Sequence, residues 1–571
     1  MLATEAEESA MSLEEFVKLP STVVFDVINT KKFQSFINAH PFIKIGTQLG
    51  TGYIPVYLNI QNIPILLEEL GKSYLLYPTI LSPLDDVANT EAGITKVIDH
   101  PSLNISGKGV IIGIIDTGID YTKDVFRYED GTSKIISIWD QTLEGSRGAN
   151  LYYGAEFTRD QINEALRAES PFDLVPTKDT DGHGTFLASV AAGRETNDYI
   201  GASPGAELVV VKLKRAHPYF IEELLIPPDN PNLYQNVDVM LGVQYIVDVA
   251  RKENAPVVLC IGLGSNFSGH DGFTYFEQYI SYLSQRPGFA VVTAGGNESN
   301  AKHHTQGKLF RTGSTDNIGI RVGEVASFQV AILGATFDKF SVGVTSPNGE
   351  TISRVPFYTQ TVTREELLFE KTSITIEYNQ ALNTVITVGF INAKEGEWII
   401  TIYGDSIMNG EYHAWLPITG QVSPEVQFLK PFPEYTITYP ANALRSITCG
   451  AYDTSNNSLF VSSSWGPTRL PRIAPDFVAP GVNVKGVYPT GIGTMTGTST
   501  AAAIATGAAA NLFEWSIVQG NMPSMDGDLL RRLLISGCRR EEGEQYPNIR
   551  WGYGKLDLYQ TMWSIRGYRA T

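Results

Sequence analysis

The sequence predicts an α/β protein built on a parallel sheet, preceded by a small α+β unit and interrupted by an inserted β-sandwich or jelly roll. Three observations lead to this prediction. Runs rich in Val and Ile, such as GVIIGIID (109–116) and ELVVVKL (207–213), are typical of parallel strands buried on both faces. Helix-like segments alternate with these runs. Between about 300 and 436, short strands with Gly, Asn and Pro turns replace that alternation.

The N-terminal region predicts the α+β unit, which we assign to residues 1–85. Its apolar segments TVVFDVI, YIPVYLNI and YLLYPTIL are separated by the helical stretches KFQSFINAH and IPILLEELG. The polar connection SPLDDVANTEAGI follows, and its turn-forming residues indicate a domain boundary.

The α/β domain is predicted in two parts, residues 86–300 and 436–571. The first part contains further buried strands, APVVLCIGLG and FAVVTAGGN, and the helix NVDVMLGVQYIVDVARKE; the second begins near TITYPANALRSITCGAYD. Residues 301–435 form the predicted insert, with the strands VASFQVAILGA, KFSVGVTSP, TSITIEYN, NTVITVGFI and GEWIITIYG.

Composition excludes several classes of protein. The net charge of −18 and the pI near 5.0 argue against nucleic acid or an anionic membrane as the partner, because like charges repel. The start, MLATEAEESAMSLEEF, lacks a basic segment followed by an apolar run, so we expect neither a signal peptide nor a membrane anchor. Three cysteines in 571 residues predict buried thiols in a reducing compartment, which indicates cytoplasmic synthesis.

Three polar residues stand in settings that suit catalysis. Asp116 follows five apolar residues at a predicted strand end, where functional side chains of parallel sheets gather. His183 lies between two glycines before an apolar helix-like run, which leaves both ring nitrogens available. Ser499 precedes TAAAIATGAAA, where a helix N-terminus would favour an oxyanion. Taken alone, each has a structural interpretation, as a turn Asp, a turn His and an N-cap Ser.

Their order along the chain decides between these interpretations. Asp, His, Ser is the order found in subtilisin, and DTGID, GHGTFLASVAAG and GTSTAAAIATG together resemble the three signature blocks of the subtilisin-like serine proteases. The resemblance implies a subtilisin-like catalytic domain and a serine endopeptidase with the triad Asp116, His183 and Ser499.

The resemblance also implies an oxyanion donor and a substrate-binding strand. FAVVTAGGNES is similar to the block whose Asn stabilises the oxyanion, which assigns that role to Asn297. CIGLGSN is similar to the strand that binds the substrate backbone, so Gly262, Leu263 and Gly264 are expected there. Gly262 stands where Ser is usual in the family, a change that removes a side chain and keeps the backbone contacts.

The layout of the whole chain resembles one branch of this family, the Csp proteases of clostridial spores. Asp116 and His183 are 67 residues apart, which leaves room for an insertion, and a β insert separates Asn297 from Ser499. The resemblance implies that the leader is a prodomain, a chaperone bound in cis and cleaved off by the enzyme at about residues 80–90. It also implies a protein substrate, the zymogen of a spore cortex hydrolase, and a spore-associated location.

A second class of function stays open, because the same branch includes pseudoproteases with decayed triads that act as binding or signalling proteins. The presence of Asp116, His183, Ser499 and Asn297 favours the active enzyme. No HExxH or CxxC spacing indicates a catalytic metal, and we expect no cofactor. Acidic pairs such as Asp179 and Asp181 or Glu222 and Glu223 are more often solvated surface than metal ligands, so we assign no calcium site to them.

Overall fold

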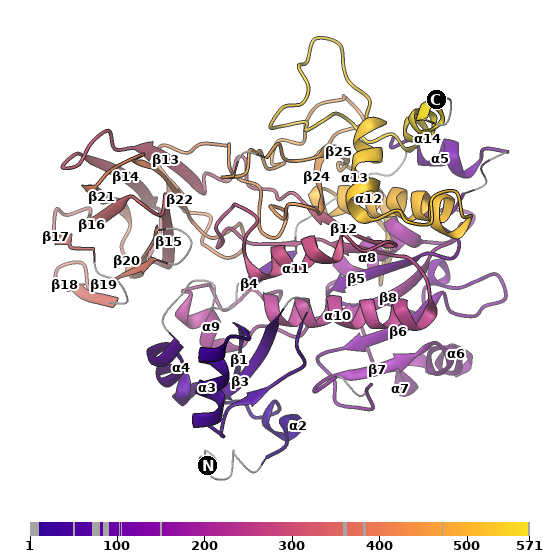
Figure 1. The fold of residues 1–571 in the computed structure, drawn as a ribbon, viewed down its shortest axis with the longest axis horizontal. Coiled ribbons are helices and arrows are strands. Elements are labelled where there is room, and N and C mark those ends of the chain that lie inside the picture. Colours follow the sequence, from indigo (N-terminus) through magenta and orange to yellow (C-terminus); the bar gives the residue numbers. More distant parts are fainter. Residues whose placement is uncertain are drawn as a thin grey trace.

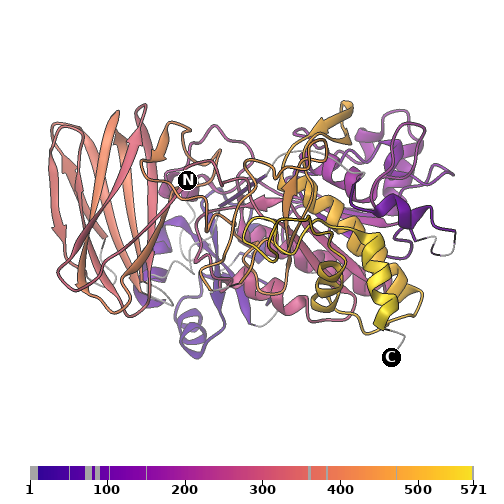
Figure 2. The same cartoon turned by 90° about the horizontal axis from the view of Figure 1, so that it is seen from above.

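The computed structural model describes residues 11–49, 52–70, 80–83, 91–101, 103, 105–148, 151–357, 362–380, 384–470 and 472–568. In Figure 1 an α/β unit occupies the right-hand side, an N-terminal unit lies at the lower left of it, and a β-rich unit projects to the left. Figure 2, seen from above, shows the strands of the β-rich unit side by side at one end of the molecule.

The α/β unit is built on an eight-stranded sheet in the order β25-β24-β12-β10-β5-β8-β6-β7. Every neighbouring pair is parallel except β6 and β7, which form an antiparallel edge. The strands are β5 (Ile111–Asp116), β6 (Ile135–Asp140), β7 (Ala155–Thr158), β8 (Glu207–Lys212), β10 (Val257–Ile261), β12 (Phe289–Ala294), β24 (Ile447–Tyr452) and β25 (Phe477–Pro480). The predicted α/β class with a largely parallel sheet is confirmed.

Helices cover both faces of this sheet, as its runs of Val and Ile require. On one face, α8 (His183–Ala192) and α12 (Thr498–Phe513) pack against the strands in one hydrophobic core. On the other face, α10 (Asn236–Glu253) and α11 (Tyr275–Leu283) pack against them in a second core. Small residues let α12 approach closely, since a Cβ added at Gly507 would lie 2.4 Å from Cβ of Ala202.

Shorter elements complete the α/β unit. The helices are α5 (Ile94–Ile98), α6 (Arg159–Arg167), α7 (Pro171–Leu174), α9 (Pro218–Glu223), α13 (Gly527–Ser536) and α14 (Leu558–Tyr568), with 3₁₀ and π turns η2 (Asp124–Phe126) and η3 (Glu514–Val518). The short strands of this unit are β9 (Tyr234–Gln235), β11 (Leu263–Gly264), β26 (Val484–Tyr488) and β27 (Gly491–Met495), and β4 (Ile80–Pro83) of the N-terminal region pairs with two of them.

The N-terminal unit packs its sheet against α10 and α11. It contains α2 (Leu13–Phe16), β1 (Thr22–Ile28), α3 (Lys31–Ala39), β2 (Lys44–Ile45), β3 (Tyr53–Asn59), η1 (Ile60–Asn62) and α4 (Ile63–Leu70). Its strands lie in the order β1-β3-β2, and Phe25 meets Phe220 of α9 edge to face, with ring centroids 5.4 Å apart. Most of the predicted strand YLLYPTIL lies outside the described residues, which resume at Ile80.

The β-rich unit is a sandwich of a six-stranded and a five-stranded antiparallel sheet, in the orders β13-β22-β15-β20-β19-β18 and β17-β16-β21-β14-β23. Alternating apolar residues from both sheets form one core, where Phe328 stacks on Phe390 at 4.8 Å. The strands are β13 (His304–Lys308), β14 (Thr315–Val322), β15 (Ala326–Gly334), β16 (Lys339–Thr345), β17 (Thr351–Val355), β18 (Val362–Leu367), β19 (Thr372–Gln380), β20 (Thr384–Ala393), β21 (Gly396–Ser406), β22 (Glu411–Trp415) and β23 (Val426–Phe428).

Aromatic and histidine rings join the sandwich to the α/β unit. His270, which follows β11, stacks on Trp415 at the end of β22, with centroids 4.1 Å apart and planes 7° apart. His304, the first residue of β13, packs against the same Trp415 at 4.9 Å. Burial lowers the pKa of His270 to about 4 and that of His304 to about 3, so both rings are neutral at physiological pH.

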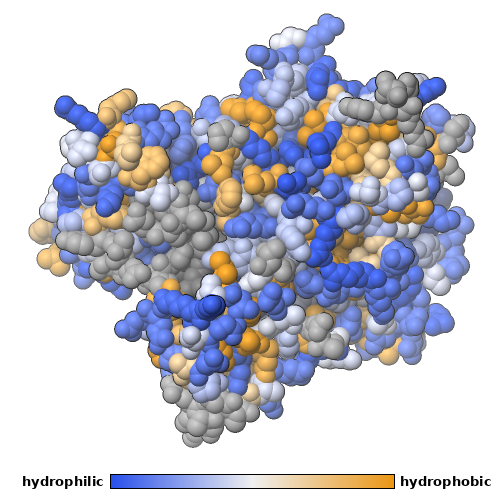
Figure 3. Space-filling model, in the orientation of Figure 1, coloured by the Kyte–Doolittle hydropathy of each residue, from blue (hydrophilic) through white to orange (hydrophobic). Residues whose placement is uncertain are grey.

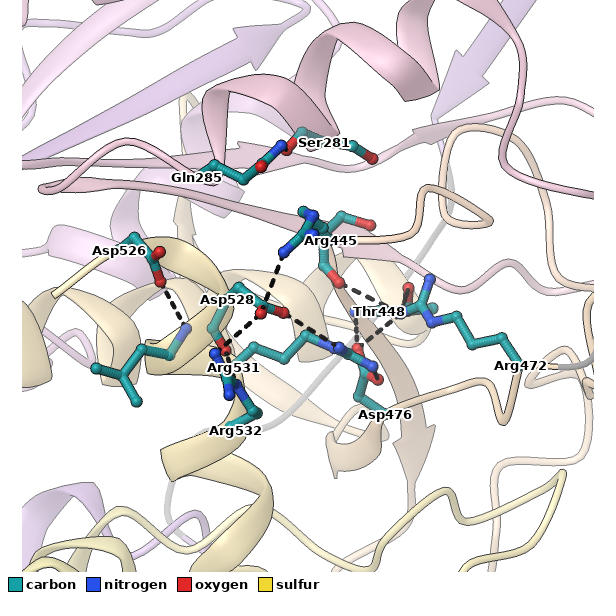
Figure 4. Close-up of polar contacts among 12 residues, drawn as sticks. Ser281, Gln285, Arg445, Thr448, Arg472, Asp476, Asp526, Asp528, Arg531 and Arg532 are labelled. Atoms are coloured by element: carbon teal, nitrogen blue, oxygen red, sulfur yellow. Dashed lines mark hydrogen bonds and ion pairs between the residues drawn. The ribbon is translucent and has the colours of Figure 1, made fainter.

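A buried ion cluster holds the second part of the α/β unit together (Figure 4). Asp476, which precedes β25, accepts hydrogen bonds from Arg531 of α13 at 2.6 Å, Arg472 at 3.0 Å and the Thr448 N–H of β24 at 2.8 Å. Burial acts to raise the pKa of Asp476, but the two guanidinium groups outweigh it and the pKa falls below its usual value. The cluster therefore fixes α13 to the end of the sheet.

The surface and the buried thiols agree with the composition. On the face shown in Figure 3, hydrophilic residues predominate and hydrophobic ones form small groups between them. Among the described residues, one helical stretch, Thr498–Val518, is long and apolar enough to span a membrane, and 83% of its apolar 18-residue window is buried inside the fold. Cys260, Cys449 and Cys538 are free and buried, as predicted.

Candidate active site

The end of β5 and the start of α8 bring two predicted site residues together. Asp116 is the last residue of β5 and His183 the first of α8. Oδ1 of Asp116 lies 2.7 Å from Nδ1 of His183, and the side chains are only 1% and 2% exposed. The glycine after His183 permits this approach, because a Cβ at Gly184 would lie 2.3 Å from the Gly118 carbonyl oxygen.

Ser499 reaches the same point from a third element. It is the second residue of α12, it is fully buried, and its Oγ lies 3.4 Å from Nε2 of His183. Three residues, 67 and 316 positions apart along the chain, thus form a continuous line of polar contacts.

The partners of His183 fix its tautomer. A carboxylate only accepts hydrogen bonds, so Nδ1 carries the proton and donates it to Asp116. Nε2 then presents its lone pair to the Ser499 hydroxyl. This arrangement can accept the hydroxyl proton at Nε2, which is what activates a serine oxygen as a nucleophile.

Asn297 lies beside Ser499, held by the residue that precedes the serine. Oδ1 of Asn297 accepts hydrogen bonds from both the N–H and the Oγ1 hydroxyl of Thr498, each at 3.1 Å. Because the Asn297 amide oxygen faces Thr498, the NH₂ group of the same amide points away from Thr498, where it can donate hydrogen bonds. An amide and a helix N-terminus together can stabilise a negative oxygen.

The predicted substrate strand runs past the same residues. A Cβ at Gly262 would lie 2.8 Å from Cδ1 of Leu187, 3.2 Å from Cβ of Ser499 and 3.3 Å from Cε1 of His183. Gly262 therefore does more than omit a side chain, because any other residue there would press on Ser499 and His183. Leu263 and Gly264 form β11, next to Gly262 in the chain.

A segment of the N-terminal region, β4, lies between β11 and β9. β4 pairs antiparallel with β11, with Pro83 opposite Leu263 and Ser82 opposite Gly264. Its other edge pairs antiparallel with β9, with Leu81 opposite Tyr234 and Ile80 opposite Gln235. β4 is thus the middle strand of a three-stranded sheet, the position in which an extended peptide is bound by backbone hydrogen bonds.

The acidic pair before α8 corrects one expectation. Asp179 is 4% exposed, and it accepts hydrogen bonds from the N–H groups of Gly182 and Thr185 and from the Thr185 hydroxyl. It is therefore a buried carboxylate at a helix N-terminus and not solvated surface. Asp181 is exposed, as expected, and accepts a hydrogen bond from the His183 N–H at 3.2 Å, so both acids hold the start of α8.

The structure thus brings all seven predicted site residues into one region, and it adds groups that the sequence did not single out. Thr498 holds Asn297 although its motif, GTS, drew attention only to the serine. β9 was not predicted because two residues, Tyr234 and Gln235, carry no periodic signal. Within the described parts of the chain, no group of three or more His, Cys, Asp or Glu side chains is arranged to hold a metal ion.

Comparison with known proteins identifies similar chains. The profile of the Subtilase family matches residues 107–400 and 430–554. The solved structure of the Clostridium perfringens CspB protease superposes with a TM-score of 0.74 and 28% sequence identity, covering 84% of this chain and 97% of that one. The Arabidopsis thaliana Subtilisin-like protease SBT1.9 is 26% identical over 246 residues, 38% of this chain and 29% of that protein. Subtilisin-like protease SBT2.3 from the same plant is 35% identical over 105 residues, 17% of this chain and 12% of that protein. The matched parts span less than a third of these plant relatives.

Proposed function

Because the chain belongs to the subtilase family, a family of subtilisin-like serine proteases, we propose that it is an active serine endopeptidase with the triad Asp116, His183 and Ser499. The observation that carries the proposal is the line of contacts from the Asp116 carboxylate through the His183 ring to the Ser499 hydroxyl, at 2.7 and 3.4 Å. The contact at 3.4 Å is long for a hydrogen bond, and such contacts tighten when a substrate binds.

The proposed reaction follows from this geometry. Asp116 orients His183 and stabilises the imidazolium that forms when Nε2 takes the proton of Ser499. Oγ of Ser499 attacks the peptide carbonyl, and the oxyanion is stabilised by the Asn297 amide and the Ser499 N–H. His183 returns the proton to the leaving amine, and water then hydrolyses the acyl-enzyme.

The N-terminal unit acts, in this proposal, as a prodomain that the enzyme cleaves itself. The support is β4, which runs antiparallel to the proposed substrate strand and ends at Pro83 beside Leu263. A chain in this position would present a peptide bond just beyond Pro83 to Ser499. The proposed cleavage interval, about residues 80–90, includes residues 84–90, which lie outside the described part of the chain.

The proposed physiological substrate is the zymogen of a spore cortex hydrolase, activated by limited proteolysis in a spore. Support comes from the similarity to the CspB protease over nearly the whole of that chain, and from the leader and inserted sandwich. The second candidate function, a pseudoprotease that signals by binding, is supported by the pairing of β4 with both β11 and β9, because a strand in this position would keep another peptide away from β11.

Intact mass of the expressed chain tests the proposal. We expect the wild type to yield two fragments split within residues 80–90, and Ser499→Ala to remain whole. The exposed Ser353→Ala provides a matched control and should be cut like the wild type. An uncut wild type that also fails to react with a fluorophosphonate probe would reject the enzyme and favour the pseudoprotease.

A further inference from the structure

The residue after Asn297 makes buried contacts that the proposed reaction does not use. Glu298 is 1% exposed, and its Oε2 lies 2.6 Å from Nδ1 of His303. Its other carboxylate oxygen, Oε1, accepts the N–H of Thr419 at 3.0 Å. A buried carboxylate needs such partners, and removing them leaves an uncompensated charge.

Both partners lie where the sandwich joins the α/β unit. His303 directly precedes β13, the first strand of the sandwich, and Thr419 follows β22, four residues after its end at Trp415. The two chain segments are themselves joined, because the Leu416 N–H donates to the His303 carbonyl at 2.9 Å. Glu298 therefore ties the point at which the chain enters the sandwich to the segment that connects β22 with β23.

The backbone around Asn297 depends on the same residue. The Glu298 N–H donates to Oγ of Ser464 at 3.0 Å, and the Ser464 N–H donates to the Gly296 carbonyl at 2.8 Å. Thr498 fixes only the amide oxygen of Asn297. The position of the Asn297 Cα is thus set by neighbours on either side, of which Glu298 is the one anchored to the sandwich.

We propose that Glu298 is a positioning residue, which holds the oxyanion donor Asn297 in place by anchoring it to His303 and Thr419 at the base of the sandwich. The inference rests on the proposed function, since it requires Asn297 to stabilise the oxyanion. Misplacing a catalytic group by about 1 Å can cost about 100-fold in rate. The inserted sandwich thereby contributes to turnover without touching the substrate.

The test measures the first-order rate of self-cleavage in full-length chains made by cell-free synthesis. Because this cleavage is intramolecular, its rate constant contains no step of substrate encounter. We expect Asn297→Ala to slow it by about 100- to 1,000-fold, and Glu298→Ala by about 10- to 100-fold. Glu298→Gln should stay near wild type, because its amide can still accept from Thr419 and bond to the other tautomer of His303.

The double variant separates positioning from general stability. If Glu298 acts through Asn297, then Asn297→Ala with Glu298→Ala is no slower than Asn297→Ala alone. If Glu298→Ala does not fold, His303→Ala takes its place. It is made in the wild-type and in the Asn297→Ala protein, and the two rates of self-cleavage are compared in the same way. Asp338→Asn is the matched control: this buried carboxylate in the sandwich accepts from the N–H groups of Met408, Asn409 and Gly410. It should lower the melting temperature and leave the cleavage rate unchanged.

Three results would overturn the inference. The first is that Glu298→Ala cleaves itself at the wild-type rate. The second is that Glu298→Ala slows cleavage by the same factor in the wild-type and in the Asn297→Ala protein. The third is that Asp338→Asn slows cleavage as much as Glu298→Ala does. If the wild type neither cleaves itself nor reacts with a fluorophosphonate probe, the proposed function fails instead, so the two failures are distinguishable.

Discussion

Oδ1 of Asp116 lies 2.7 Å from Nδ1 of His183, and almost no water reaches either side chain. The carboxylate can only accept, so this contact holds the ring with its proton on Nδ1 and its lone pair toward Ser499. An amide in place of the carboxylate could donate to Nδ1 and favour the opposite tautomer.

Asp116→Asn should therefore reduce the rate of self-cleavage by about 10,000-fold with little change in fold. The rate is measured by intact mass over time, and circular dichroism checks the fold. Asp124→Asn, at an exposed aspartate nearby on η2, is the control and should keep the wild-type rate. A fully active Asp116→Asn protein would remove Asp116 from the triad.

Gly262→Ser should slow self-cleavage by about 10- to 100-fold. The new Cβ would meet Leu187 at 2.8 Å and lie only 3.2 Å from Cβ of Ser499, so the site must shift. Gly148→Ala is the matched control, because its Cβ would meet only the Glu156 carboxylate, at 3.2 Å. If Gly262→Ser cleaved itself at the wild-type rate, the Leu187 side chain would have to be able to move aside without displacing the triad.

Retention of the cleaved N-terminal unit should weaken as pH rises. Asp26 of β1 is 2% exposed, and Oδ2 accepts from the Asn236 amide at 3.1 Å. Burial, with a contribution from the charge of Asp238, raises the pKa of Asp26 from 3.8 to about 7. Tyr53 and Tyr57 of β3 and Tyr439 also face it, but they stay neutral because their pKa values are raised.

The sign follows from proton linkage. Between about pH 4 and pH 7 the bound unit keeps the Asp26 proton that the released unit loses, so affinity falls about tenfold per pH unit and levels off above pH 7. The measurement is the fraction of the N-terminal fragment that stays with the tagged enzyme after washing at pH 5 and pH 8. Asp26→Asn should flatten this dependence, and an unchanged slope in that variant would assign it to another group.

Asp476→Asn should destabilise the protein by about 3–5 kcal/mol, because it leaves the charges of Arg472 and Arg531 buried without their carboxylate. Urea unfolding, carried out in the Ser499→Ala background to prevent self-digestion, measures the loss. Glu411→Gln breaks the exposed pair with Lys308 and should cost less than about 1 kcal/mol. Equal effects from the two variants would contradict the role assigned to the buried cluster.

The sequence predicted those parts of the structure that have a local signal. Runs such as IIGIID could only be buried strands, and Asp116 and His183 occupied recognisable positions at a strand end and a helix start. β11 was expected from the family resemblance and not from a local signal, and β9 was not predictable at all, because it is two residues long and becomes a strand only through pairing with β4. Similarly, Glu298 and His303 are ordinary polar residues until the fold buries them against each other.

The position of β4 also determines how activity toward other proteins would begin. Ile80–Pro83 belongs to the same chain as β9 and β11, between which it lies, so before release its effective concentration there is on the order of millimolar. An external peptide must compete with that occupant whatever the amount of enzyme present. The lag before the first external cleavage should thus be a property of each molecule, set by the departure of its own N-terminal unit and independent of dilution.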